Sequence, residues 1–403
     1  MSTGTVDTVV GIPTRNEAET IAHVAQIADE GLAALGRGGV IVLADNGSTD
    51  GTVDRFLGTA LRSRTAVVRS AAAESGKGTN VFALIEKTLE LGARRLVLLD
   101  GDVRSAQPDW VISLAHASDG PEPRMVLPVY RRNRYEAVST NHLVRPLLAA
   151  SFGAYVQQPI GGDFAFNRAF LERVGAWRRP QSANLYGIDV WLTANALRSG
   201  LRLVEAPLGR KVHNSPFPKV LYLPQQVLDA LFHVVAEVGE VRPAQPAERQ
   251  EAAVDEVAAP QDPGLVARIS RAVCSYLDAY GPDVQLLFPS ARDLKPAPWG
   301  LRVTVDDWPQ LLADALEALA AGELERARDH LIALCVNRVM TFWTEIEGLA
   351  TADVDALLHR QARETASAVA ERAIVFTAPP APTAFDPGRW RDHQTQSHPP
   401  FNA

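Results

Sequence analysis

The first half of the chain alternates between two spacings of hydrophobic residues. Short aliphatic runs predict buried strands at Thr8–Pro13, Val40–Leu43, Ala66–Val68 and Leu96–Leu99. Between these runs, apolar residues recur every three or four positions, which predicts helices directly after the first strand, over 52–62 and over 79–92. This order predicts an α/β fold, in which helices cover both faces of a mostly parallel sheet.

Polar residues indicate where the first helix begins. Asn16 and Glu19 have the spacing of a capping box, in which Asn16 would be the N-cap. The residues behind it repeat at helical spacing and predict one buried apolar face. That face consists of Ile21, Val24, Ala25, Ala28 and Leu32.

The second half of the chain has a different pattern. Helical spacing predominates over 219–239, 263–282 and 305–373, which predicts a separate α-helical domain. The segment 240–262 is rich in Pro, Ala, Glu and Gln, as is typical of a mobile surface excursion. The predicted organisation is an α/β domain over 1–218, a helical domain over 219–377 that contains this mobile segment, and a flexible, proline-rich tail over 378–403.

The composition excludes several classes of partner. The 403 residues include 40 Lys and Arg against 47 Asp and Glu, a net charge of −7, so no broad basic surface is expected for nucleic acid or an anionic membrane. The sequence contains no run of about 18 apolar residues, as a membrane span requires, and its first residues lack a signal-peptide pattern. Cys274 and Cys335 lie in apolar helical patterns, which indicates buried thiols. The sequence therefore predicts a cytoplasmic protein.

Polar loops follow three of the predicted strands. They cover 14–17, 45–50 and 100–102, and the carboxyl ends of parallel strands meet at one edge of a sheet, where ligands bind in α/β folds. Asp100 and Asp102 are carboxylates one residue apart, which can hold a hard divalent cation together with phosphate oxygens and water. A simple polar turn would use the same residue types, so this motif by itself gives both interpretations similar weight.

The order of these loops resembles that of glycosyltransferases of the GT-A fold. Three motifs carry the resemblance, and it covers roughly residues 5–215. They are Pro-Thr-Arg-Asn-Glu at 13–17, Asp-Asn-Gly-Ser-Thr-Asp-Gly at 45–51 and Asp-Gly-Asp at 100–102. The resemblance implies a Rossmann-like sheet that binds a sugar nucleotide, with a divalent cation at the Asp-x-Asp pair.

Further motifs are similar to those of two kinds of retaining enzyme within that fold, the mannosylglycerate synthases and the glucosyl-3-phosphoglycerate synthases. These motifs are Ser75–Asn80, Gln158–Gly162, Tyr186–Asp189 and His213. In addition, Ser139–Leu148 is similar to the acceptor-side segment of the phosphoglycerate enzymes. A helical C-terminal extension suits the mannosylglycerate type.

The resemblance implies how the chain would hold a sugar nucleotide. Lys77 would reach the diphosphate, since an ammonium group on a flexible stem can approach phosphate oxygens closely. Asp100 would face the ribose or a metal-bound water. The other implied residues are Pro13, Arg15 and Glu17 at the base and ribose, Asp45 near the nucleoside, and Gly161, Gly162 and Asp163 at the sugar.

The resemblance also implies the metal ligands and the chemistry. Asp102 would bind Mg²⁺ or Mn²⁺ directly, and His213 would complete the metal shell. The cation and Lys77 would stabilise negative charge on the departing nucleoside diphosphate. If configuration is retained, the leaving phosphate oxygen takes the acceptor proton, and Asp189 orients the acceptor. The predicted catalytic residues are Asp189, Lys77 and Asp102.

The acceptor implied by the resemblance is a small hydroxy acid. Its candidate ligands are Thr140, Asn141, Asp189 and Arg131. Val138 stands where an arginine is expected in the phosphoglycerate enzymes, which favours D-glycerate over 3-phosphoglycerate. For 3-phosphoglycerate, the nearby Arg131, Arg132 and Arg134 would supply the replacement charge. The donor would be a UDP- or GDP-linked hexose. Apolar helix faces favour a homo-oligomer such as a dimer.

Three other functions would use related features. An inverting GT-A transferase acting on a glycan, lipid or other acceptor would have the same nucleotide site and differ in the anomeric configuration of its product. A sugar-nucleotide pyrophosphorylase would need a glycine cluster after the first strand, which Gly11–Glu17 lacks. A binding protein without catalysis would have little need of Asp100, Asp102, Lys77 and His213 together.

Overall fold

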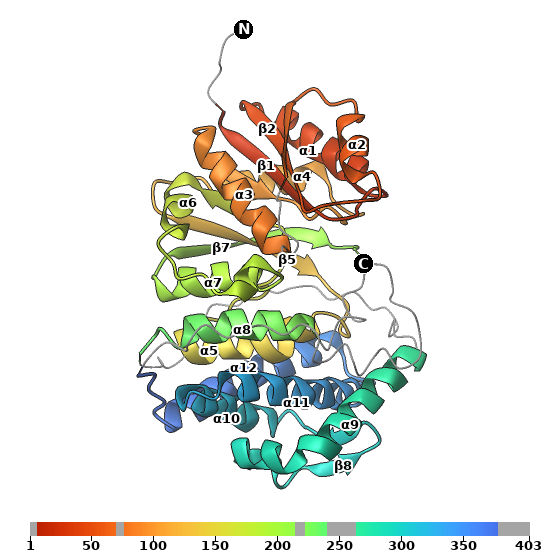
Figure 1. Ribbon diagram of the computed structural model, residues 1–403, viewed down its shortest axis with the longest axis vertical. Coiled ribbons are helices and arrows are strands. Elements are labelled where there is room, and N and C mark those ends of the chain that lie inside the picture. The colour runs from red at the N-terminus through yellow and green to blue at the C-terminus, as the bar shows by residue number, and fades with distance from the viewer. Residues whose placement is uncertain (1–5, 70–75, 214–221, 240–262, 378–403) are drawn as a thin grey trace. The chain divides into compact units, whose positions relative to one another are not determined.

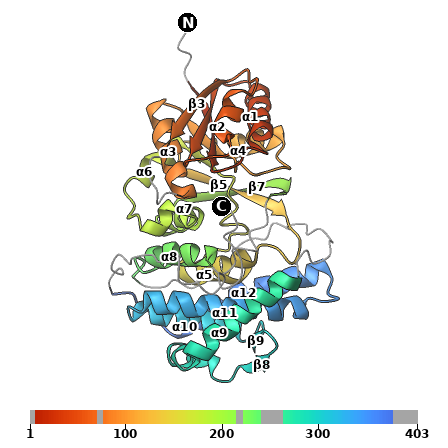
Figure 2. The same ribbon diagram turned by 45° about the vertical axis from the view of Figure 1, so that its right-hand side comes forward.

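The computed structural model describes residues 6–69, 76–213, 222–239 and 263–377, and its contacts divide the chain into two units (Figures 1 and 2). The α/β unit comprises the described parts of 1–131 and 158–215, and the helical unit those of 132–157 and 216–402. The division differs from the predicted boundary at 218 because 132–157 groups with the helical unit. The predicted mobile segment 240–262 and the tail 378–403 lie outside the described residues.

The α/β unit is built on a seven-stranded sheet with the order β3-β2-β1-β4-β6-β5-β7. All neighbouring strands are parallel except β6, which is antiparallel to β4 and β5. The mostly parallel sheet predicted from the sequence is therefore confirmed. The strands are β1 (Thr8–Thr14), β2 (Gly39–Asp45), β3 (Arg64–Arg69), β4 (Arg95–Leu98), β5 (Arg124–Arg131), β6 (Ala165–Asn167) and β7 (Arg202–Arg210).

Helices cover both faces of this sheet, as predicted (Figure 1). The alternation along β1 shows how: Val10 and Ile12 lie in the core beneath α1 and α4, whereas Gly11 faces Leu84 of α3. The helices on the first face are α1 (Ile21–Leu35), α2 (Thr52–Leu57) and α4 (Pro108–Ala117). Those on the second are α3 (Lys77–Glu90), α6 (Arg168–Val174) and α7 (Ile188–Arg198).

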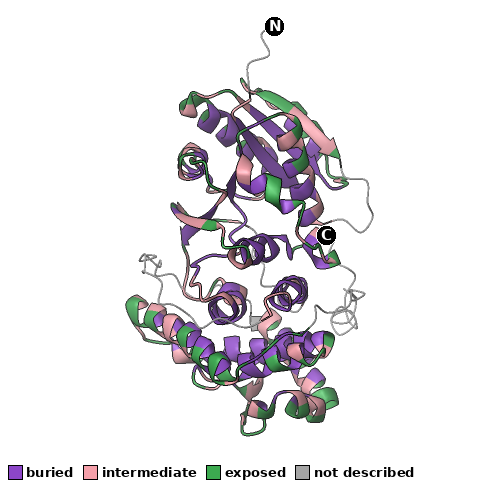
Figure 3. Cartoon of the chain, turned by 90° about the vertical axis from the view of Figure 1, so that its left-hand side faces the viewer, coloured by how far each residue is buried: buried purple, intermediate pink, exposed green. Residues whose placement is uncertain are grey.

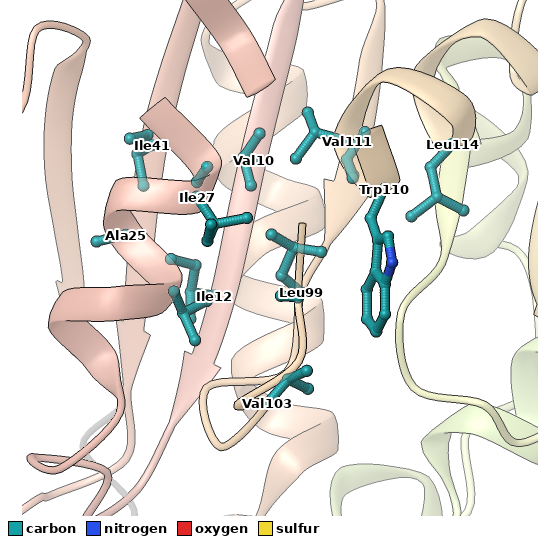
Figure 4. Close-up of a cluster of buried hydrophobic side chains, with 14 of the residues drawn as sticks. Val10, Ile12, Ala25, Ile27, Ile41, Leu99, Val103, Trp110, Val111 and Leu114 are labelled. Atoms are coloured by element: carbon teal, nitrogen blue, oxygen red, sulfur yellow. The ribbon is translucent and has the colours of Figure 1, made fainter. Parts of the chain in front are cut away.

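The core beneath α1 and α4 is mostly aliphatic and includes the aromatic residues Phe56, Trp110 and Tyr130. Val10 and Ile12 of β1 meet Ile27 of α1, and Trp110 of α4 extends the cluster (Figure 4). Every residue of the predicted apolar face of α1 is buried, from Ile21 to Leu32. Buried residues line β1, β2, β4, β5 and β6, whereas β3 at the edge of the sheet has none (Figure 3). This packing holds the carboxyl edge of the sheet in place, and the candidate site lies at that edge.

The predicted capping box at Asn16 is wrong. Helix α1 begins at Ile21 with Thr20 at the N-cap position. Asn16 has a φ of 59°, and its side-chain oxygen accepts a hydrogen bond of 2.9 Å from the backbone N–H of Thr49. The side chain thus joins the loops that follow β1 and β2, because a tertiary partner competes with the local cap.

The reversed direction of β6 affects the site. An antiparallel strand brings its amino end to the edge where its parallel neighbours have their carboxyl ends. The segment Gly161–Asp163, which precedes β6, therefore joins the loops that follow β4, β5 and β7. Residues that follow the parallel strands and residues that precede β6 therefore lie at the same edge of the sheet.

The helical unit is formed by α-helices, two short helical turns and the two-stranded antiparallel sheet β8–β9. α11 contacts α8, α9 and α10, and α12 packs against α5 and α10. None of the described helices is long and apolar enough to cross a bilayer. Cys274 and Cys335 are free thiols; Cys335 is buried as predicted, whereas Cys274 is only partly buried. The elements are η1 (Thr140–Val144), α5 (Arg145–Phe152), α8 (Leu223–Val235), α9 (Pro263–Leu287), η4 (Pro289–Ala291), β8 (Lys295–Ala297), β9 (Gly300–Arg302), α10 (Trp308–Ala320), α11 (Leu324–Glu345) and α12 (Thr351–Glu371).

Candidate functional site

Two lysines and three carboxylates form a connected cluster at the carboxyl edge of the sheet. The Lys77 ammonium lies 2.9 Å from Asp100 and 3.1 Å from Asp189. The Lys211 ammonium lies 2.8 Å from Asp100 and 2.6 Å from Asp163. All five side chains are less than one fifth exposed. We call these residues the lysine–carboxylate cluster.

Five separate segments supply this cluster, and the fold places each of them. Lys77 is the first residue of α3, and Asp189 lies in the first turn of α7, which packs against α3 (Figure 1). Asp100 follows β4, Asp163 precedes β6 and Lys211 follows β7. The amino ends of the two helices and the ends of three strands therefore converge.

The glycines beside Lys77 allow a second loop to approach the start of α3. The N–H groups of Gly76 and Gly78 donate to the carbonyl oxygens of Asn184 and Leu185, at 3.2 and 3.0 Å. A Cβ atom on Gly78 would lie 1.9 Å from the carbonyl oxygen of Ala183. These backbone N–H groups are thus used to hold the loop before α7, and Lys77 reaches the cluster through its side chain.

Replacing Gly78 by alanine is expected to displace the loop at 183–185 and lower the free energy of unfolding by about 1–3 kcal/mol, the usual cost of overpacking. The apparent affinity for a nucleoside diphosphate should fall with it, since Lys77 and Asp189 lose their common support. Chemical denaturation and nucleotide titration measure the two effects. The control is Gly175→Ala, where no atom lies within 4 Å of the new Cβ. Equal stability of the two variants would contradict the prediction.

Gly161 and Gly162 are also required by close packing. A Cβ on Gly162, whose φ is +90°, would lie 2.0 Å from a carboxylate oxygen of Asp100 and 3.1 Å from the Lys77 ammonium. A Cβ on Gly161 would lie 2.4 Å from Cγ of Pro128. The structure therefore uses both glycines to seat the 161–163 segment against the cluster.

Charge within the cluster shifts its pKa values in opposite directions. Burial opposes ionisation of Asp100, but Lys211 and Lys77 outweigh it and lower the pKa of this carboxyl group. Burial raises the pKa of Asp102, and the neighbouring charge of Asp100 raises it further. Burial likewise raises the pKa of Asp189. The cluster together with Asp102 has four carboxylates against two ammonium groups, so it carries two negative charges when all four are ionised, and a divalent cation would neutralise them.

The loop that carries Asp102 is hydrogen-bonded to the segment before His213. The N–H of Arg104 donates to the carbonyl oxygen of Val212 at 2.9 Å, and the N–H of Val212 donates to the Ser105 hydroxyl at 2.8 Å. Of the predicted metal ligands, Asp102 lies two residues before Arg104 and His213 lies directly after Val212. Among the described residues, no group of three or more His, Cys, Asp or Glu side chains is arranged to hold a metal. Hard divalent cations accept water and phosphate oxygens for the remaining positions.

The residues predicted for the base and ribose lie in the loops after β1 and β2. Pro13 is buried within β1, Arg15 is exposed and Glu17 is partly buried. Asp45 ends β2 and is buried, and its carboxylate accepts hydrogen bonds from the hydroxyl and the N–H of Ser48, at 2.5 and 3.1 Å. The carboxylate of Asp45 therefore shapes the loop after β2.

Two of the predicted acceptor ligands belong to the helical unit. Thr140 and Asn141 lie in η1, a buried π-helical turn, and the carbonyl oxygen of Asn141 accepts from Gln361. Arg131 lies in the α/β unit, at the exposed end of β5. Asp189 is the predicted acceptor residue that the structure brings into the lysine–carboxylate cluster.

Sequence reasoning missed Lys211 and Tyr130. The Tyr130 hydroxyl donates to Asp163, and the ring lies 5.3 Å from the Lys211 ammonium. The available signal was a basic residue directly after the last strand, where a parallel strand delivers side chains to the site edge. Tyr186, within the predicted 186–189 motif, is partly exposed. Burial raises the pKa of its phenol, and the nearby carboxylates add to this shift while Lys77 opposes it.

A comparison with solved structures finds similar folds. Glucosyl-3-phosphoglycerate synthase from Mycobacterium tuberculosis, in complex with Mg²⁺ and uridine diphosphate, is 24% identical with a TM-score of 0.47, over 57% of this chain and 79% of that chain. The same enzyme with Mn²⁺, uridine diphosphate and phosphoglyceric acid is 25% identical with a TM-score of 0.47, over 57% and 78%.

Other comparisons give no match. No protein-family model matches the chain, and no curated protein matches it.

The comparison with solved structures also finds a similar chain described as a mycobacterial protein. It is 24% identical with a TM-score of 0.46, over 57% of this chain and 75% of that chain.

Proposed function

We propose that this chain is a metal-dependent glycosyltransferase. It would transfer a hexose from a UDP- or GDP-linked donor to a small hydroxy acid, D-glycerate or 3-phosphoglycerate, with retention of anomeric configuration. The ligands proposed are of the classes found in the glucosyl-3-phosphoglycerate synthase structures, which hold uridine diphosphate with Mg²⁺ or Mn²⁺. Cytoplasmic location and a dimeric state stay predictions.

The observation that carries the proposal is the position of Lys77. An ammonium group has three N–H donors, and contacts with Asp100 and Asp189 account for two of them. The third is available to an anionic oxygen at the carboxyl edge of the sheet, where α/β folds bind nucleotides. Both neighbouring charges raise the pKa of Lys77 against the effect of burial, so the group stays cationic. Lys77 can therefore stabilise charge on a departing diphosphate.

The donor set fits a divalent cation. Asp102 would hold it through a carboxylate oxygen, the kind of ligand that Mg²⁺ and Mn²⁺ prefer, and His213 would add an imidazole nitrogen. Bound there, the cation would supply charge neutralisation for the leaving diphosphate. The two uncompensated negative charges of the cluster and Asp102 favour the binding of the cation.

Asp189 is proposed to orient the acceptor. Its carboxylate is held by Lys77 at 3.1 Å in the first turn of α7, so its place is fixed before any ligand binds. The proton of the attacking hydroxyl would pass to the leaving phosphate oxygen on the same face of the sugar. With this route the chain needs no nucleophile of its own.

The test is a screen of donors against acceptors, with EDTA-treated protein as the control. UDP- and GDP-linked glucose and mannose are paired with D-glycerate, 3-phosphoglycerate and unrelated alcohols. The proposal expects release of nucleoside diphosphate that depends on both the acid acceptor and the metal. NMR of the product gives the anomeric configuration, and an inverted product would identify the alternative transferase. Release of pyrophosphate would identify a pyrophosphorylase.

A further inference from the structure

Lys211 has no donor left for a ligand. Its ammonium donates to Asp100 at 2.8 Å, to Asp163 at 2.6 Å and to the carbonyl oxygen of Gly161 at 2.9 Å. These three acceptors use all three N–H groups of an ammonium. The side chain is 3% exposed, and the ring of Tyr130 lies beside it. We call the three oxygens and this ring the Lys211 cage.

The two lysines of the cluster therefore differ in what they can do. Lys77 is more exposed and keeps one donor for an incoming anion. Lys211 is enclosed, and its contacts are already complete. The two oxygens of Asp100 are divided between them, because Lys77 contacts Oδ1 and Lys211 contacts Oδ2. Asp100 is thus held from both sides.

The cage also fixes the backbone of the Asp-Gly-Asp turn. Asp163 accepts from Lys211 through Oδ2 and from the N–H of Asp100 through Oδ1, at 2.8 Å. Its Oδ2 further accepts from the Tyr130 hydroxyl. One buried carboxylate therefore links the ammonium to the main chain two residues before Asp102.

We infer that Lys211 is a positioning residue: a tethered internal cation that sets the place of Asp100 and the turn to Asp102 without touching substrate. The inference rests on the proposed function for its effect on metal binding. The role of Lys211 in fixing Asp100 does not depend on the proposed function, because this chain alone supplies all the contacts of the cage. An empty cage of the same shape would accept a small primary ammonium ion.

The experiment removes the lysine and supplies the missing atoms. In the Lys211→Ala variant, n-propylammonium replaces the deleted carbons and the ammonium group. Tetramethylammonium has the same charge but no N–H donor, so it controls for ionic strength. The readouts are Mn²⁺ affinity without donor or acceptor, the melting temperature, and a crystal structure with and without propylammonium.

We expect Lys211→Ala to weaken Mn²⁺ binding about tenfold or more, the range seen when residues that orient metal ligands are changed. Propylammonium should restore most of the affinity and raise the melting temperature, and tetramethylammonium should do neither. The Asp100 carboxylate should be displaced in the variant and return with propylammonium. Lys87→Ala, on α3 and paired with Glu90, is the matched control and should match the wild type.

Three results would overturn the inference. They are unchanged Mn²⁺ affinity in folded Lys211→Ala, equal restoration by tetramethylammonium, and an undisplaced Asp100 in the variant crystal. If Lys211→Ala does not fold, Lys211→Arg replaces it; its side chain fills the cage, so weakened Mn²⁺ binding without a response to propylammonium is expected, and wild-type affinity contradicts the inference. A wild-type protein that binds no Mn²⁺ defeats the proposed function, and the melting and crystal readouts still decide the role of Lys211.

Discussion

Replacing Asp102 by asparagine is expected to lower turnover by about a thousandfold, the upper range for losing one group that stabilises charge in a transition state. Asp100 is compensated by two ammonium groups, whereas burial and neighbouring carboxylates raise the pKa of Asp102. Asp102 is therefore the carboxylate of the pair with most to gain from a cation. Asparagine keeps its size but removes the charge that would bind the metal.

The measurement is turnover at saturating donor across a Mn²⁺ titration. Wild-type protein treated with EDTA should fall to the rate of the variant, and added Mn²⁺ should restore the wild type alone. Asp54→Asn is the control, because Asp54 is an exposed acid on α2, outside the site. Full activity in Asp102→Asn, or in metal-free wild type, would remove the basis of the proposed function.

Replacing Lys77 by methionine should lower turnover about a hundredfold to a thousandfold and also destabilise the fold. Methionine fills the volume but leaves Asp189 without its ammonium at 3.1 Å and Asp100 with Lys211 alone. Removing one partner of a buried ion pair costs about 3–5 kcal/mol, since the other charge stays desolvated. Both losses follow from one substitution, so a second variant is needed to separate them.

The double variant Lys77→Met with Asp189→Asn separates charge stabilisation from folding. Asparagine is neutral, so no uncompensated carboxylate remains at position 189, and much of the lost unfolding free energy should return. Turnover should stay below that of the single variant Asp189→Asn, because that variant keeps the ammonium that faces the diphosphate. Denaturant titration and steady-state kinetics give the two values, with Lys87→Met as the control on the same helix. Recovery of turnover together with stability would mean that Lys77 has a structural role.

Local pattern was sufficient to predict the architecture of the α/β unit. The spacing of apolar residues can be read from the sequence without knowing any long-range contact. The apolar residues predicted for the buried face of α1, from Ile21 to Leu32, are all buried. Element ends were less predictable. Helix α2 ends at Leu57, where the prediction ran to 62, because Gly58 follows it as the C-cap residue and a helix end depends on such local contacts.

The candidate site shows the same division. Asp100 and Lys77 were predicted from motifs, and the structure joins them by a contact of 2.9 Å. Lys211 was not predicted, because its role depends on β7 lying beside β5 and on β6 running in the reverse direction. Lys77 was expected at a diphosphate, and the structure adds that the N–H groups of Gly76 and Gly78 on either side of it bind the loop before α7.

The sequence by itself determined the alternation of strands and helices and the polar residue types at the strand ends, since both depend on local spacing and chemistry. The tertiary structure decided which charges meet. Lys211, Asp163 and Tyr130 are far apart along the chain and gain their contacts from strand order and direction alone. Because a buried charge is stable only beside a partner, the sheet topology decides which lysine is fixed inside the cluster and which remains available to a ligand.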